Sequence, residues 1–421
     1  MIKIKKFIGN KGLGRLEKLL DKRKASNNAS IPIVTKILRD IKKNKKKAVI
    51  KYEKKFSDNI RVKPSTKEIN LAIKSLNPKI KKAIDYAYNR ILKYHSIQQI
   101  KNITYKDKLN NKLQHISVHI NKVGIYVPAN LPSTLLMNAI PAKLAGVKQI
   151  ILANPRLNKK LNAAVMYASK KIGIKEIYSM GGAQAVGSLA YVQKVDKIVG
   201  PGNIFVARAK KEVFGDVGVE GMIAGPSEIT VLADKKSEIN SVVTSLVGQA
   251  EHDINSQCIM ISKDLNILKK INKLFKLSLK NLPRKKIAQK SLKTYGLLIH
   301  ARNDKNIVDL INLIAPEHLE LNVKNPKKYL KKIINAGSIC IGKFSAMAVT
   351  DYNAGTNHIL PTMGSAKFSS GLNVAEFYKK ISYINLSKKG IEVIGKQAIT
   401  LAEYENLEGH AQSIKSRIRR N

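Results

Sequence analysis

One repeated pattern constrains the fold of this chain more than any other feature. Between residues 115 and 214, short apolar runs alternate with helical stretches, and glycine or proline turns separate them. Strands that alternate with helices at a spacing of about 25 residues are typical of βαβ units, whose strands pair in parallel. The pattern therefore predicts an α/β fold, and such sheets bind ligands beyond the carboxyl ends of their strands. The expected strands are 123–128, 149–154 and 176–180, and the expected helices are 134–145, 163–172 and 204–214.

A second α/β block follows the first. We expect strands at 229–233, 258–262 and 337–342, and helices at 237–251 and 307–314. Residues 1 to about 100 are Lys-rich and have the 3-to-4 apolar spacing of amphipathic helices. With 421 residues the chain exceeds what one compact core accommodates, so two or more globular parts are expected.

Two glycine turns follow strands and precede helices, at Gly181-Gly182 and at Gly200-Pro-Gly-Asn203. Neither turn fits the G-x-G-x-x-G fingerprint of dinucleotide-binding folds. Their position still favours contacts to phosphate or ribose through backbone N–H groups at a helix start. Two plain tight turns explain the spacing equally well, and the residues alone leave both interpretations open.

The net charge of +48 first suggests a nucleic-acid partner. The basic residues are mostly lysines scattered between apolar positions, and they lack the interleaved aromatics expected for single-strand binding. We interpret the excess as codon bias and expect no specific nucleic-acid partner. No apolar stretch approaches the roughly 20 residues of a membrane span, so no membrane association is expected. Cys258 and Cys340 are too few for a disulfide framework, and we expect buried thiols in a cytoplasmic protein.

Polar side chains that suit metal and acid/base chemistry are spread over four segments. Gln249 and His252 lie three residues apart, on one face of a helix, and together with nearby carboxylates they suit a divalent metal. Three more pairs are Glu317 with His318, Asp351 with His358, and Glu405 with His410. We expect Gly409 to break the last helix, so that Glu405 and His410 both point inward. Together these groups favour a metal-dependent enzyme.

Nine motifs in the same order along the chain resemble those of histidinol dehydrogenases. They include Gln249-Ala-Glu-His252-Asp253 and Ala315-Pro-Glu317-His318-Leu319. The full set is 123–128, 137–143, 181–185, 195–203, 224–228, 249–253, 315–319, 351–362 and 405–410. The resemblance covers nearly the whole chain.

This resemblance implies an activity and a set of site residues. Members of the family oxidise L-histidinol through L-histidinal to L-histidine, the last steps of histidine biosynthesis, with two NAD and one zinc ion per subunit. In the matching motifs His318 is the base and Glu317 activates water. The implied zinc ligands are Gln249, His252, Asp351 and His410. The implied substrate contacts are Ser227, Gln249, His252, His318, Asp351, His358, Glu405 and His410, and the implied NAD contacts are Tyr126, Gln184 and Asn203.

The resemblance also implies an intertwined homodimer with shared active sites. Each chain would have two Rossmann-like parallel-sheet domains. We accordingly expect an N-terminal helical segment (1–22) and an NAD-binding α/β domain (123–228). A discontinuous α/β domain (23–122 and 229–372) would carry the zinc and acid/base residues. The segment 373–421 would cross to the partner chain, beyond a Ser/Gly-rich flexible joint at 364–371.

The chain departs from the family pattern in two shortened loops, at 129–133 and 190–194, which we expect to border the cofactor cleft. Two alternative functions stay open at this point. One is a metallohydrolase that uses the same ligands, with Glu317 as the base. The other is a basic nucleic-acid-binding protein that has kept an old enzyme fold.

Overall fold

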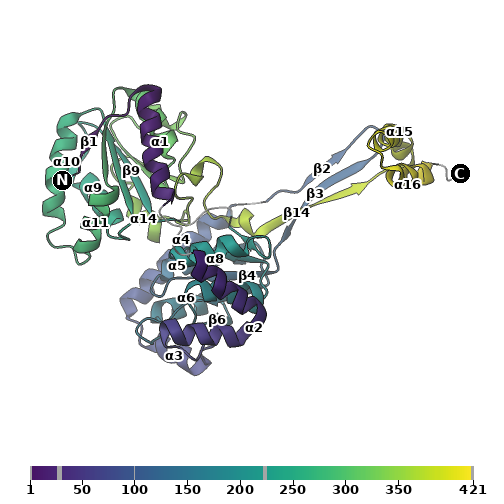
Figure 1. Cartoon of the computed structure of the whole chain (residues 1–421), viewed down its shortest axis with the longest axis horizontal. Coiled ribbons are helices and arrows are strands. Elements are labelled where there is room, and N and C mark those ends of the chain that lie inside the picture. Colours follow the sequence, from purple (N-terminus) through teal and green to yellow (C-terminus); the bar gives the residue numbers. More distant parts are fainter. Residues whose placement is uncertain (1, 26–30, 99, 221–224, 419–421) are drawn as a thin grey trace.

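Five parallel strands form the first sheet, in the order β6-β5-β4-β7-β8. The computed structural model describes residues 2–25, 31–98, 100–220 and 225–418 (Figure 1). The strands β4 and β7, first and fourth in sequence, are neighbours in this sheet. The loops that follow these two strands therefore open a crevice at the carboxyl edge. The strands are β4 (Lys122–Tyr126), β5 (Gln149–Ala153), β6 (Glu176–Tyr178), β7 (Lys197–Val199) and β8 (Gly218–Val219).

Helices cover both faces of this sheet. One face packs against α2 (Ile31–Ser57), α7 (Gly182–Gly187) and α8 (Ile204–Val213). The other packs against α3 (Thr66–Lys74), α4 (Pro78–Ser96), α5 (Pro132–Leu144) and α6 (Ala163–Ile172). From the sequence, residues 23–122 were expected to belong with the second sheet. The described helices of that range, α2 to α4, instead bury their apolar faces on the first sheet, and helical periodicity alone does not say which sheet a helix covers.

Six parallel strands form the second sheet, in the order β1-β11-β10-β9-β12-β13. Helices α9 (Ile239–Ala250), α10 (Leu265–Ser278) and α11 (Lys285–Tyr295) cover one face, and α1 (Gly9–Ala25) and α12 (Asp304–Ile314) cover the other. The N-terminal segment is part of this lobe, because β1 pairs with β11. The strands are β1 (Ile4–Lys5), β9 (Glu228–Ala233), β10 (Gln257–Ser262), β11 (Leu297–His300), β12 (His318–Asn322) and β13 (Ser338–Ile341).

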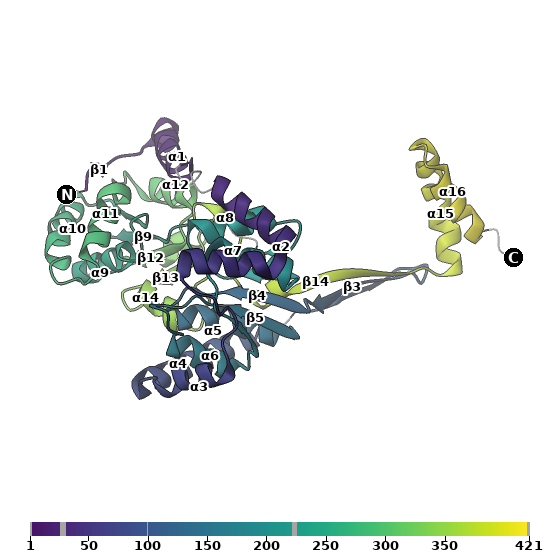
Figure 2. The same ribbon diagram turned by 60° about the horizontal axis from the view of Figure 1, so that its bottom comes forward.

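A long arm extends from the first lobe (Figures 1 and 2). Its stalk is an antiparallel sheet of β2 (Ile103–Lys106), β3 (Lys112–His119) and β14 (Tyr378–Asn385). At its tip lie α15 (Lys388–Tyr404) and α16 (Glu408–Ile418), which pack on each other. The helix breaks at Asn406, which has a φ of 58°, and not at Gly409, which lies inside α16. An asparagine tolerates this left-handed conformation without the freedom of glycine.

The segment 364–371 contains one turn of 3-10 helix, η3 (Ser365–Lys367), and its side chains range from buried Ser365 to Phe368 at 76% exposure. Ser365 is buried, and its hydroxyl donates a hydrogen bond to the Thr362 carbonyl oxygen at 2.7 Å. Leu372, which follows the segment, is buried in the core of the first lobe. Both cysteines are buried free thiols, as predicted. Within the described residues, no helix combines the length and apolarity needed to cross a bilayer.

Candidate functional site

A cavity of about 480 Å³ lies between the two lobes and collects most of the candidate residues. The first sheet contributes the loops after β4 and β7, including Pro128 and Asn203, from its carboxyl edge. The second sheet contributes residues at its amino edge, including Ser227 before β9 and His318 at the start of β12. The expectation of a ligand beyond the carboxyl ends therefore describes the first sheet but is wrong for the second.

Glu317 and His318 form the buried centre of this cavity. Their side chains approach each other at 3.9 Å between Oε1 and Nε2, and His318 Nε2 lies 3.7 Å from Asp351 Oδ1. Burial lowers the pKa of His318 to about 3, so its imidazole is neutral at pH 7. Burial also raises the pKa of Glu317 well above the usual value. A neutral imidazole has a ring nitrogen free for a proton, and a carboxyl group with a raised pKa is a stronger base than an ordinary one once it is ionised.

His358 and Asp351 are tied together beside His318. His358 Nδ1 lies 2.6 Å from the backbone oxygen of Asp351, and His358 Nε2 lies 3.4 Å from Thr134 Oγ1. Asp351 belongs to the short helix α14 (Met347–Tyr352). Burial raises the pKa of Asp351 to about 7 and lowers that of His358 to about 4. Burial therefore disfavours the ionised form of the Asp351 carboxyl group, and a cation bound nearby would stabilise that form.

Three of the four predicted zinc ligands line this cavity. Gln249 is 1% exposed at the end of α9, and its Oε1 has no hydrogen-bond partner among the described residues. A buried amide oxygen without a partner costs free energy, which a bound cation would offset. His252 lies in the turn after α9, exposed at the cavity, and desolvation lowers its pKa, which favours the neutral, ligating form. Oxygen and imidazole donors from Gln249, His252 and Asp351 fit zinc.

The fourth predicted ligand lies elsewhere in this chain. His410 is exposed on α16, and Glu405 is exposed at the end of α15, both at the tip of the arm (Figure 2). The expectation that both point inward is wrong for the single chain. Among the described residues, no three His, Cys, Asp or Glu side chains gather into a ready metal cage. The described part of one chain therefore brings three of the four predicted ligands to the cavity.

Two of the predicted cofactor residues meet in the interior of the first lobe. Gln184 Nε2 donates to Glu53 Oε1 at 2.9 Å, and the Gly181 N–H donates to the same oxygen at 2.8 Å. The Tyr126 hydroxyl accepts from the Gly182 N–H, and burial raises its pKa to about 12. Glu53 was not predicted, because nothing distinguishes a single acid in a Lys-rich helix from a solvated one.

The third cofactor candidate, Asn203, is exposed in the cavity at the start of α8. Its side-chain oxygen accepts from the N–H groups of Phe205 and Val206, both at 3.1 Å. Gly200, three residues before Asn203, has a φ of 111°. A Cβ on this residue would lie 2.0 Å from the backbone carbonyl oxygen of Tyr126. Only glycine permits this close approach of the two loops.

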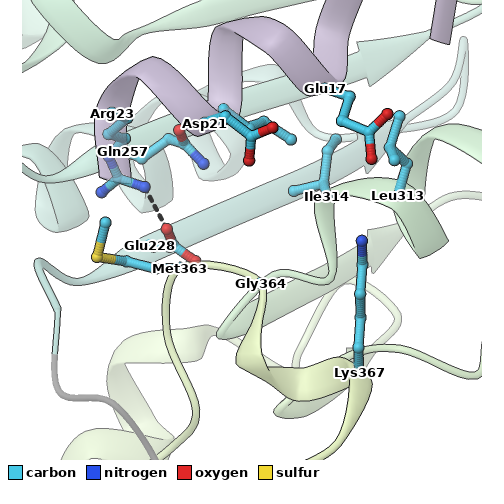
Figure 3. A pocket seen from close by; sticks show the side chains of 11 residues that line it. Glu17, Asp21, Arg23, Glu228, Gln257, Leu313, Ile314, Met363, Gly364 and Lys367 are labelled. Atoms are coloured by element: carbon cyan, nitrogen blue, oxygen red, sulfur yellow. Dashed lines mark hydrogen bonds and ion pairs between the residues drawn. The ribbon is translucent and has the colours of Figure 1, made fainter. Parts of the chain in front are cut away.

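A buried ion pair, drawn as a dashed line in Figure 3, is linked by a hydrogen bond to Glu317. Arg23, on α1, pairs with Glu228 and donates to the Asn255 oxygen at 3.1 Å. The Glu228 N–H in turn donates to Glu317 Oε2 at 2.7 Å. Neither Arg23 nor the role of Glu228 is predicted from the sequence. Ala224, the first residue of the motif that contains Glu228, lies outside the described residues.

The two shortened loops have different locations. The loop 129–133 lines the cavity through Leu131 and Ser133. The segment 190–194 lies at the opposite edge of the sheet, where Lys122 Nζ bonds to the Gln193 oxygen at the start of β4. The expectation that both loops border the cleft is therefore wrong for the second.

Comparisons with known proteins agree over the whole chain. The family model described as histidinol dehydrogenase matches residues 20–418. A histidinol dehydrogenase of Pelagibacter ubique is 57% identical over 412 residues, which cover 96% of each chain. That of Hydrogenovibrio crunogenus is 39% identical over 433 residues, with full coverage of both. The crystal structure of the enzyme from Elizabethkingia anophelis superposes with a TM-score of 0.90 at 34% identity, covering 99% of this chain and 98% of the other. The chain belongs to the histidinol dehydrogenase family of oxidoreductases.

Proposed function

We propose that this chain oxidises L-histidinol through L-histidinal to L-histidine, with two NAD and one zinc ion per subunit. The observation that carries the proposal is the buried Glu317–His318 pair, which shares one cavity with the partnerless Gln249 oxygen. Membership of an oxidoreductase family disfavours the hydrolase alternative. We propose Ser227, His358 and Glu405 as further substrate contacts.

In the proposed reaction His318 accepts the hydroxyl proton of the substrate. Its imidazole is neutral and buried, and Glu317 and Asp351 lie beside its Nε2. Both carboxylates stabilise the cation that forms when the proton arrives. Glu317 then removes a proton from the water that adds to the aldehyde carbon, which its burial and raised pKa favour.

Zinc, held by Gln249, His252, Asp351 and His410, would supply a positive centre that orients the substrate's nitrogens. The crevice above β4 and β7 supports placing NAD against the loops that carry Tyr126, Gln184 and Asn203. Orientation by fixed groups lowers the entropic part of the barrier before any bond changes.

We further propose a homodimer in which each arm completes the other chain's site. The stalk and tip expose large apolar side chains, which solvent-facing elements of a monomer seldom do. Examples are Tyr383 at 50%, Ile384 at 69% and Tyr404 at 85% exposure. Because the tip carries Glu405 and His410 away from their own cavity, a second copy would supply both residues.

The test is a coupled measurement of turnover and metal content. Purified protein with L-histidinol and NAD should form two NADH per histidine and lose this activity on treatment with a chelator. Added zinc should restore the activity. A folded, zinc-loaded dimer without histidinol-dependent NADH formation would refute the proposed function.

A further inference from the structure

Glu320 connects two elements that carry predicted zinc ligands. It lies on β12, two residues after His318, and is 4% exposed. Its Oε1 accepts a hydrogen bond from Ser245 Oγ at 3.1 Å and a second from the Met347 N–H at 2.7 Å. One buried oxygen therefore joins α9 and α14, which also pack against each other.

The spacing of these contacts points to the site. Ser245 precedes Gln249 by four residues on α9, and Met347 precedes Asp351 by four residues on α14. Residues four apart lie on the same face of a helix, one turn from each other. Glu320 and His318, two apart on a strand, also share one face. Glu320 thus lies one turn behind both ligands.

The start of α14 depends on this carboxylate. Met347 is the first residue of the helix, and the residue before it, Ala346, has no side chain that can cap the helix. Helix starts require acceptors for their free N–H groups, and an acidic side chain there also suits the helix dipole. Because α14 has only six residues, loss of this anchor would move Asp351 with it.

We infer that Glu320 is a positioning residue that fixes the spacing of Gln249 and Asp351 for the metal. This inference rests on the proposed function, in which these two side chains bind zinc. Partners that hold metal ligands in place typically contribute 10- to 100-fold to metal affinity. Glu320 should contribute to zinc affinity without touching zinc.

The experiment compares zinc binding to metal-free, full-length protein, measured by competition with a chromophoric chelator. Glu320→Leu should weaken the zinc affinity about 10- to 100-fold. It should also change the visible spectrum of the cobalt-substituted site, because the ligand geometry changes. Glu320→Gln should restore both, since the amide keeps an oxygen that accepts the two hydrogen bonds.

A matched control removes a helix cap remote from the site. Asp264 is the N-cap of α10, and its carboxylate accepts a hydrogen bond from the Asn266 N–H at 2.8 Å. Helix α10 carries no candidate residue. Asp264→Leu should lower the melting temperature but leave zinc affinity and the cobalt spectrum unchanged. An equal loss of affinity in Asp264→Leu would overturn the inference, since general destabilisation would then explain the effect.

Two further outcomes separate this inference from the proposed function. If Glu320→Leu and wild type bind zinc with equal affinity, the positioning role alone is overturned. Wild-type protein that binds no zinc would refute the proposed metal site, and the inference with it. If Glu320→Leu does not fold, Ser245→Ala removes one of the two bonds, and unchanged zinc affinity in that variant would overturn the inference.

Discussion

At the scale of single residues, burial decides the chemistry of the site. His318 and Glu317 differ from ordinary surface residues because the protein interior disfavours their charged forms. The motif Pro316-Glu317-His318 is visible in the sequence, but the raised and lowered pKa values come from the surrounding structure. The Glu228 N–H and the Arg23 ion pair behind it are part of that surrounding structure.

Substitution of His318 should affect catalysis and not metal binding. We expect His318→Asn to lower kcat by about 10²- to 10⁴-fold, the usual contribution of a general base. Its zinc content should equal that of wild type, because His318 is not among the proposed ligands. His300→Asn, at the far end of β11, is the control and should keep full kcat. A normal kcat in His318→Asn would remove it from the mechanism.

His252 should show the opposite behaviour. We expect His252→Asn to lose zinc and to raise the KM for histidinol in parallel, because the proposed metal orients the substrate. Zinc content is measured by elemental analysis after dialysis, beside steady-state kinetics. Equal zinc content in this variant and in wild type contradicts the ligand assignment.

Glu317 should control the second oxidation and its pH dependence. Glu317→Gln should slow aldehyde oxidation by about 10²- to 10⁴-fold. The yield should then fall from two NADH per histidinol toward one, with aldehyde that a carbonyl reagent traps. In wild type the base is the ionised carboxylate, so the rate of the second step should fall as the pH drops through the raised pKa of Glu317.

The pH profile is measured with zinc-saturated enzyme, because a bound dication keeps Asp351 ionised. Burial lowers the pKa of His318 and raises that of Glu317, so we expect Glu317 to titrate at the higher pH of the two. Glu317→Gln should retain a slow second oxidation, whose rate can be measured against pH. If that rate still falls at low pH as it does in wild type, a group other than Glu317 controls the pH dependence.

At the scale of elements, short helices and glycine turns place the site residues. Helices α7 and α14 have six residues each, too few to be stable alone, so partners from other elements hold them. Glu53 holds the turn before α7, and Glu320 holds the start of α14. Both acids belong to elements whose apolar patterns gave no sign of a function.

Asn203 allows its structural and cofactor roles to be separated. Asn203→Ala should cost about 1 kcal/mol of folding free energy, because α8 loses its N-cap. Asn203→Asp keeps the cap and should keep that stability. If the free amide N–H₂ contacts NAD, Asn203→Asp should nevertheless raise the KM for NAD. Urea unfolding and NAD kinetics measure the two effects, and an unchanged KM would leave Asn203 only its structural role.

At the scale of the whole molecule, the arm separates His410 from the rest of the proposed zinc site. His318 lines the cavity, whereas His410 belongs to α16, the helix at the arm's tip (Figure 1). In the proposed dimer each site combines the cavity of one chain with the tip of the other. The exposed apolar side chains of the arm would then be buried against the partner.

Mixing two inactive variants tests this arrangement. Dimers that combine a His318→Asn chain with a His410→Asn chain should contain one intact site and one doubly altered site. Random mixing after reversible dissociation should therefore restore about a quarter of the wild-type activity, since half of the dimers are mixed. Each variant refolded alone is the control. Absence of recovery in mixtures with a normal dimer mass would place the complete site within one chain.

The sequence by itself determined the α/β class, the family and most of the chemistry-bearing side chains. These features depend on local periodicity and on motifs whose residue types the chemistry requires, as at Gln249 and His318. The tertiary structure decided which edge of each sheet faces the cavity, and it assigned α2 to α4 to the first sheet. It also revealed Arg23, Glu53 and Glu320, whose partners lie far away in sequence, and it carried His410 out on the arm. Contacts between distant segments have no local signature, so only the folded chain could show them.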